Sequence, residues 1–421
     1  MISKWRWLVG QITQLLWLRA GLFALIGVVT ALAGVAAESY LPLDTPEVVG
    51  ADAVGTVLNV LASSMLAVTT FSLGVMVSAY GNASSNVTPR ATKLLMQDTT
   101  SQNVLSTFIG SFLFGLVGIV TLTIEGYGSR GRLVLFLVTI GVIVVVVMAL
   151  LRWIDYLSRL GSVGETTKRI EAVARDAIGR RIEQPCLGGR RLDDTVRVPD
   201  NALSVPPDKT GYVQHIDTAA LESWAEEHSA EIFLGVVPGS FVVAGGALAR
   251  VRITANDPEE VADAVRRSFT VGEERTFEQD PRFGVVVLAE VASRALSPGV
   301  NDSGTAIDVI GRMVRVLSDW AREDKPDEED IKCPHVFVPP IDDRDLFEDA
   351  FMMIGRDGAH LIEVQLRLQK ALAHLSERGD SAFREAALRE SARALATARR
   401  EVYADEDMAR IEAAAPRASL G

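Results

Sequence analysis

Residue types that could perform metal or catalytic chemistry are sparse in this 421-residue sequence. His215 with Asp217, and Cys333 with His335, are the two pairs that could ligate a metal ion. A zinc site normally uses three or four protein ligands, so structural roles are favoured for both pairs. The sequence contains no nucleophile elbow, phosphate loop, dinucleotide fingerprint or His-Glu metalloprotease motif. We therefore expect no enzyme activity, no metal and no cofactor.

The most unusual polar loop is the segment SPGVNDSGTA at residues 297–306. Its candidate functional residues are Ser297, Pro298, Asn301 and Asp302. Asn301 or Asp302 can cap the helix expected to follow, and this structural role is favoured. The alternative is a ligand or subunit contact formed by two side-chain oxygens near the N-terminus of that helix. An enzyme site in this loop is the weakest functional interpretation.

A second set of polar and small residues lies within an apolar stretch at residues 54–80. The set recurs every three or four residues, which places its members on one helix face. These residues are Asn59, Ser63, Ala67, Thr70, Gly74 and Ser78. One interpretation is the water-exposed wall of a pore. The other is close packing inside a helix bundle, where small residues let backbones approach each other.

Four apolar segments are long enough to cross a bilayer, whose core of about 30 Å requires roughly 20 helical residues. They are residues 15–37, 54–80, 104–124 and 133–151. The small residues of the first segment (Gly27, Ala31, Gly34) and of the third (Ser111, Gly115, Gly118) predict packing seams. No segment carries a central carboxylate, lysine or histidine, which argues against a proton relay inside the membrane.

Basic residues beside the spans predict the orientation of the chain in a bacterial inner membrane. They are Lys4, Arg6, Arg19, Arg90, Lys93, Arg152, Arg159, Lys168 and Arg169. The segment between the first two spans carries acidic residues and no Lys or Arg, as expected outside. Arg130 and Arg132 are a weak exception to this pattern, because they lie in the short loop between the last two spans, which is expected outside. We predict a multi-pass protein with both termini in the cytoplasm.

The loop after the second span contains Thr88-Pro89-Arg90, followed by Asp98. These residues could form a bent, charged elbow at the inner face of the membrane. A simple structural turn, in which Pro89 interrupts the helical pattern, is the favoured interpretation.

The chain changes character after residue 152, where the transmembrane domain (residues 1–152) is expected to end. A connecting helix, continuing from the last span toward residue 180, and a proline-rich linker fill residues 153–200. Short alternating runs predict a small β-rich module at residues 201–256, with a helix at residues 218–227. Residues 257–421 are predicted to be mainly helical and to end in two long helices, 360–377 and 382–415. The predicted fold class is a four-helix transmembrane region joined to a cytoplasmic α+β domain.

Charge follows the same division. The first 152 residues carry eight Lys or Arg and six Asp or Glu, and the rest carry 34 and 48, giving a net charge of −12. An acidic surface of this kind argues against nucleic-acid binding, which requires a basic face.

Several motifs resemble a bacterial family of predicted membrane proteins of unknown function, with four spans and a cytoplasmic C-terminal region. The matching stretches are SNVTPR at 85–90, residues 98–114, QDPRFG at 279–284 and ALSPGVND at 295–302. Ser303 is a departure, since relatives often have proline there. The resemblance implies the topology and no reaction.

These observations lead to a functional hypothesis of an oligomeric inner-membrane channel, with cations as the favoured ions, regulated by its cytoplasmic domain. Four short spans enclose little space, so a pore requires several copies. The acidic outer segment would concentrate cations at its entrance. The expected partners are the lipid bilayer and further copies of the chain, and the identity of an ion or small ligand stays open. The alternative is a membrane-anchored sensor or scaffold whose cytoplasmic domain binds a partner or small ligand.

Overall fold

The structure of the protein is a computed structural model that describes residues 16–40, 50–96, 98–124, 127, 129–254, 257–321 and 331–416. Lys4, Arg6 and most of the acidic segment before residue 50 lie outside these ranges. The chain divides into two compact units. Of the described residues, the span unit comprises those from 16 to 85 and from 92 to 165, and the C-terminal unit comprises 86–91 and those from 166 to 416.

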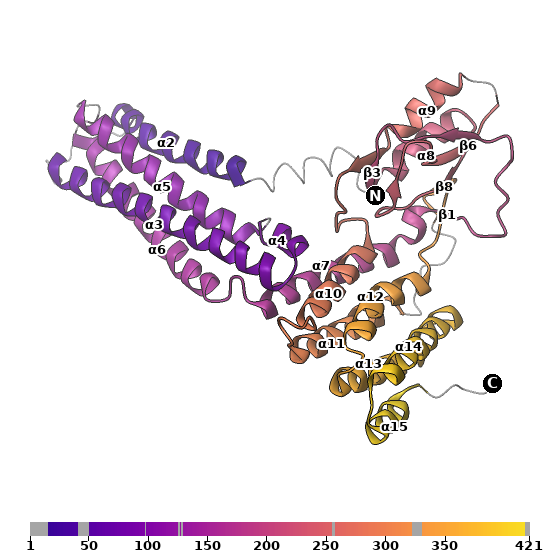
Figure 1. Ribbon diagram of the computed structural model, residues 1–421. Helices are drawn as coiled ribbons and strands as arrows, with labels where there is room; N and C mark the ends of the chain where they lie inside the picture. Colours follow the sequence, from indigo (N-terminus) through magenta and orange to yellow (C-terminus); the bar gives the residue numbers. More distant parts are fainter. Residues whose placement is uncertain are drawn as a thin grey trace. The chain divides into compact units, whose positions relative to one another are not determined.

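The span unit consists of helices, of which α2, α3, α5 and α6 run alongside one another (Figure 1). The helices are α2 (Leu16–Tyr40), α3 (Ala51–Asn86), α4 (Pro89–Met96), α5 (Thr99–Thr123) and α6 (Ser129–Leu157). Within the described residues, α3, α5 and α6 are long and apolar enough to cross a membrane. The apolar stretch found in α2 is shorter, Leu18–Ala33, so the first of the four predicted spans stays a prediction.

The predicted packing seams of α2 and α5 are confirmed where the structure describes them. A Cβ atom added to Gly27 would clash with the carbonyl oxygen of Gly110, so α2 and α5 touch through their backbones. A Cβ added to Gly115 would lie 3.1 Å from the Cβ of Ala62 in α3. Larger residues at these glycines would force the helices apart.

The helix predicted to continue from the last span toward residue 180 is interrupted. α6 ends at Leu157, and a separate helix, α7, spans Val163–Glu183. Gly161 lies between them with φ of +78°, a left-handed conformation that ends a helix and that glycine adopts readily. Apolar residues recur with a helical period on both sides of this turn, so the sequence pattern does not reveal the interruption.

The C-terminal unit contains two small sheets. The five-stranded sheet has the order β1-β8-β4-β6-β2, from β1 (Gly189–Arg191), β8 (Cys333–Val338), β4 (Glu231–Leu234), β6 (Ala249–Arg252) and β2 (Leu203–Val205). β8 runs parallel to both of its neighbours, and the other pairs are antiparallel. The three-stranded antiparallel sheet has the order β5-β3-β7, from β5 (Phe241–Val242), β3 (Gly211–Ile216) and β7 (Phe269–Gly272).

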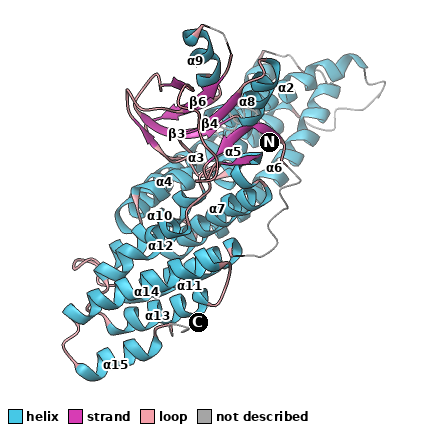
Figure 2. Ribbon diagram, turned by 90° about the vertical axis from the view of Figure 1, so that its right-hand side faces the viewer, coloured by secondary structure: helices cyan, strands magenta, loops and turns pink. Residues whose placement is uncertain are grey.

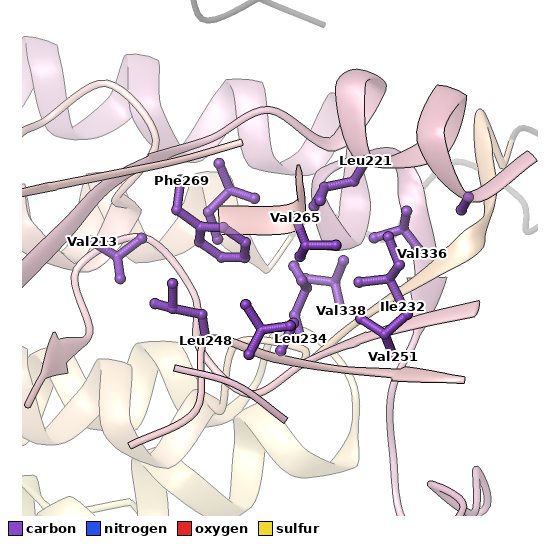
Figure 3. Close-up of a cluster of buried hydrophobic side chains, with 14 of the residues drawn as sticks. Val213, Leu221, Ile232, Leu234, Leu248, Val251, Val265, Phe269, Val336 and Val338 are labelled. Carbon is purple, nitrogen blue, oxygen red and sulfur yellow. The ribbon is translucent and has the colours of Figure 1, made fainter. Parts of the chain in front are cut away.

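Apolar side chains from both sheets meet in one core with those of α8 (Thr218–Glu227) and α9 (Pro258–Arg266) (Figure 3). Val213, Ile232, Phe269 and Val336 are among its buried members. The β-rich character was predicted correctly. The predicted limits of 201–256 are too narrow, because β1, β7 and β8 lie outside them and β8 pairs with strands far away in the sequence.

Helices form the rest of the C-terminal unit, on the other side of it from the strands (Figure 2). They are α10 (Pro281–Ala295), α11 (Ser303–Trp320), α12 (Asp343–Asp357), α13 (Ile362–Ser376), α14 (Ser381–Glu401) and α15 (Asp405–Ala414), and a 3₁₀ turn, η1 (Pro185–Gly188), follows α7. The long helix predicted for residues 382–415 is therefore two helices. Val402 has an extended backbone, and its β-branched side chain suits that conformation better than a helix interior.

Candidate functional site

The polar face of the second span is exposed in the single chain. We call Asn59, Ser63, Ala67, Thr70, Gly74 and Ser78 the α3 face, and all six residues are exposed. The side of α3 that packs in the bundle is a different one, formed by Val54, Leu58, Leu61, Met65 and Met76. At 3.6 residues per turn, these buried residues lie on the opposite side of the helix from the α3 face. Among the residues that the structure describes, this face is therefore no packing seam within one chain.

The hydroxyl groups of the α3 face bond to their own helix. Ser63 donates to the carbonyl oxygen of Asn59 at 2.7 Å, and Thr70 donates to that of Leu66 at 2.9 Å. A Cβ added to Gly74 would meet no atom within 4 Å. Each hydroxyl oxygen still has lone pairs that can accept a hydrogen bond or contact a cation. The α3 face is thus polar, its side chains are small, and the described helices do not pack against it.

The predicted elbow contains a contact that the sequence did not reveal. Val87 and Thr88 form the turn between α3 and α4, and Pro89 is the first residue of α4. Thr88 donates to Oε2 of Glu290 at 2.9 Å, and Arg90 pairs with Oε1 of the same carboxylate. Glu290 belongs to α10, and residues 86–91 cluster with the C-terminal unit. The only sequence signal for Glu290 is its position as a lone acidic residue within the apolar run of α10.

Asp98 serves a different element from Pro89 and Arg90. It is the N-cap of α5, where its carboxylate accepts from the backbone N–H of Ser101 at 2.8 Å. The hydroxyl of Ser101 lies 2.7 Å from that of Tyr156 in α6. Asp98 therefore fixes the start of α5 inside the span unit, while the elbow residues contact Glu290.

The loop at residues 297–302 joins α10 to α11 by local hydrogen bonds. Asp302 is the N-cap of α11 and accepts from the backbone N–H of Thr305 at 3.0 Å. The hydroxyl and backbone N–H of Thr305 lower the pKa of Asp302. Asn301 adopts φ of +51°, and the hydroxyl of Ser297 donates to the carbonyl of Arg294. Pro298 is exposed. Capping, the favoured structural role, is confirmed for Asp302.

The two candidate metal pairs have other partners. Asp217 caps α8 by accepting from the N–H of Ala220 at 3.1 Å. Nδ1 of His335 lies 2.7 Å from Oε1 of Glu222. Burial raises the pKa of the Cys333 thiol to about 11, which disfavours the thiolate form that binds metals. Within the described ranges, no three His, Cys, Asp or Glu side chains form a group that could hold a metal ion.

A cavity of about 250 Å³ lies between α12 and α14. Glu390 lines it and is only 5% exposed, with Nη1 of Arg393 at 3.7 Å from its carboxylate. Burial raises the pKa of Glu390 to about 7, and the charge of Glu348 adds to this effect. Arg393 opposes the shift, as does Arg389.

The long apolar helices and the mixed α+β C-terminal unit define an integral membrane protein with a large non-membrane region. The chain belongs to the family described as "Predicted membrane protein (DUF2254)", whose model matches residues 13–374. This confirms the resemblance inferred from the motifs. Membership establishes association with a membrane and assigns no activity.

The chain is similar to proteins that are described as uncharacterized and come from mycobacteria. MT1328 of Mycobacterium tuberculosis and Mb1321c of Mycobacterium bovis are each 24% identical over 284 residues, covering 65% of this chain. The match spans 53% of each relative, so the chain accounts for about half of their length. No solved structure matches the chain.

Proposed function

We propose that the protein is an oligomeric channel of the bacterial inner membrane in which the α3 face lines a path for ions, cations in particular. The observation that carries this proposal is the exposure of all six residues of that face in a protein whose other small-residue faces are packed. A lipid-facing helix has no need of a small or polar residue at every turn. A face that meets water or another copy does.

The channel requires several copies, because the described helices pack against one side of α3 and leave the α3 face open. Placing the α3 faces of neighbouring copies around one axis would produce a wall of hydroxyl and carboxamide oxygens. Such oxygens can replace part of the hydration shell of a cation. The acidic segment before α3, expected at the outer surface, would raise the local concentration of cations.

Regulation by the C-terminal unit is the second part of the proposal. α3 continues without interruption from the α3 face to Asn86, and the next turn is fixed by the bonds from Thr88 and Arg90 to Glu290. A shift of α10 would therefore act directly on the end of the helix that lines the path.

The test is ion flux through liposomes that contain the purified protein. Thr70→Leu replaces a hydroxyl of the α3 face by a larger apolar group, and it should reduce or abolish the flux of the wild-type protein. Thr123→Leu is the matched control, because Thr123 is also exposed and also bonds to its own helix, but lies on α5. Its flux should equal that of the wild type.

Two results would contradict the channel. One is vesicles that stay ion-tight under varied voltage, pH and membrane tension, which would favour the membrane-anchored sensor or scaffold. The other is a strict monomer in detergent and in bilayers, which would leave the α3 face without the neighbours that a wall requires.

A further inference from the structure

A groove of about 480 Å³ opens between α2, α5 and α6 in the span unit. Phe23 and Gly27 of α2, Thr107 and Phe114 of α5, and Gly141 and Val145 of α6 are among the residues that line it. Its size falls in the range of cavities that hold small molecules, and its lining is almost entirely apolar. The groove is distinct from the α3 face, since no residue of α3 lines it.

Glycines account for the open space. The close backbone contact of Gly27 with Gly110 sets the floor where α2 crosses α5. In α6, the third helix that lines the groove, a Cβ added to Gly141 would meet no atom within 4 Å. No side chain of the described chain fills this space, and in a bilayer an apolar opening of this kind cannot stay empty of hydrocarbon without losing dispersion contacts.

A positive charge lies one helical turn beyond one end of the groove. Arg19 precedes Phe23 by four residues on α2, and Asn103 precedes Thr107 by four residues on α5. Nη1 of Arg19 donates to Oδ1 of Asn103 at 3.0 Å, which links the two helices at this level and orients the guanidinium. The groove itself continues from Thr107 to Phe114, about 10 Å along a helix.

We propose that this groove is a binding site for a membrane phospholipid, with one acyl chain between α2, α5 and α6 and the phosphate paired with Arg19. The arrangement of charge and apolar space matches such a molecule. A phosphate at the membrane surface is followed by hydrocarbon that extends toward the middle of a core about 30 Å thick. A guanidinium suits phosphate because it is planar and permanently charged.

The experiment uses the full-length protein in phosphatidylethanolamine vesicles containing a trace of phosphatidylglycerol with a diazirine on its acyl chain. After illumination, the labelled peptides should include residues 107–114 and 138–145. Gly141→Leu, which fills the groove, and Arg19→Gln, which removes the charge, should each lower this labelling about tenfold. Arg19→Lys should restore part of it.

Matched controls separate the site from general lipid contact. Val144→Leu adds bulk to an exposed position of α6 that does not line the groove, and Arg152→Gln removes an exposed charge near the C-terminal end of α6 that does not line it either. Both should label like the wild type. A diazirine-bearing diacylglycerol, which lacks the phosphate and is uncharged, should label the groove weakly and without dependence on Arg19.

Uniform labelling of all lipid-facing helices, unchanged by Gly141→Leu and Arg19→Gln, would overturn the proposal. So would cross-links from the groove to a second copy of the chain, since they would identify a protein helix as the occupant. Neither outcome depends on ion flux, so the lipid site and the channel succeed or fail separately.

Discussion

The α3 face and the segment Gln279–Gly284 are both distinctive in the sequence. In the folded chain, the segment bonds to other elements and the α3 face is exposed. In the segment, Asp280 caps α10 and accepts two bonds from Arg275. Gln279 exchanges hydrogen bonds with the backbone of Ile216, and Gly284 lies against Ala174 of α7. The folded chain uses these residues to join the sheets to the helices, whereas it uses no residue of the α3 face in this way.

The difference separates residues that a fold requires from residues that it leaves available. Arg282 completes the segment by pairing with Asp345 and Asp349 of α12. The polar side chains of this segment bond to other residues of the same chain. The motif therefore has a structural explanation that involves no ligand. Among the described residues, the α3 face bonds only to its own helix, so we look for the reason for its polarity outside the single chain.

Asp280→Ala should have the largest effect and tests the structural half of this contrast. Asp280 is 2% exposed, and its loss leaves the partly buried Arg275 without its carboxylate, so the free energy of unfolding should fall by about 3–5 kcal/mol. Chemical unfolding in detergent, followed by circular dichroism, measures this. Asp176→Ala removes an exposed ion pair with Arg180 and should cost less than about 0.5 kcal/mol. Equal stability of the two variants would break the contrast.

Glu390 contrasts with Asp280 within the C-terminal unit, because it is buried without the close bonds that Asp280 has. Its pKa is raised from 4.5 in the unfolded chain to about 7 in the folded one, so the stability it contributes is complete below 4.5 and is lost as pH rises through 7. Glu390→Gln stays neutral and should gain roughly 3 kcal/mol on the wild type across that pH range.

Unfolding curves at several pH values provide the measurement for Glu390. Glu385→Gln, on the exposed side of the same helix, is the control. A difference between Glu390→Gln and the wild type that does not change between pH 4 and pH 8 would contradict the expectation.

Glycine substitutions test the same contrast, between packed and exposed residues, in the membrane helices. Gly27→Ala places a methyl group against the backbone of Gly110 and should destabilise the span unit by about 1–3 kcal/mol. Gly74→Ala has open space and should stabilise α3 by about 0.5–1 kcal/mol, since glycine is unfavourable inside a helix. Thermal unfolding of both variants in one detergent gives the sign of each change. Two losses of similar size would mean that Gly74 is packed.

Thr88→Val tests the elbow and should have the smallest structural effect. It removes the hydrogen bond to Glu290 from a residue that is 3% exposed, at a cost of about 1 kcal/mol. Thr123→Val, at an exposed position, should change stability by less than about 0.5 kcal/mol. If the elbow also regulates flux, Thr88→Val should alter the gating of liposome currents, whereas Thr123→Val should not. Unchanged flux in Thr88→Val would remove the regulatory part of the proposal.

Much of the fold was accessible from the sequence because it depends on near neighbours. The helix at 218–227 has the predicted limits. Asp257 and Asp280 each cap a helix and are each followed by a proline, which is a local signal for the start of a helix. Apolar runs of sufficient length marked the membrane helices, three of which meet the criteria for a span. Periodicity and capping operate within a few residues, so they can be read locally.

The tertiary structure alone decided which small-residue face is packed and which is exposed. Gly27, Gly115 and Gly74 occur in similar patterns, yet the first two meet a neighbouring helix and the third meets nothing. In a membrane helix, lipid and protein are both apolar surroundings, so hydrophobicity does not tell the inward side from the outward one. The partners of Glu290 and of β8 were equally hidden, because contacts between distant segments depend on how the whole chain packs and leave no local pattern.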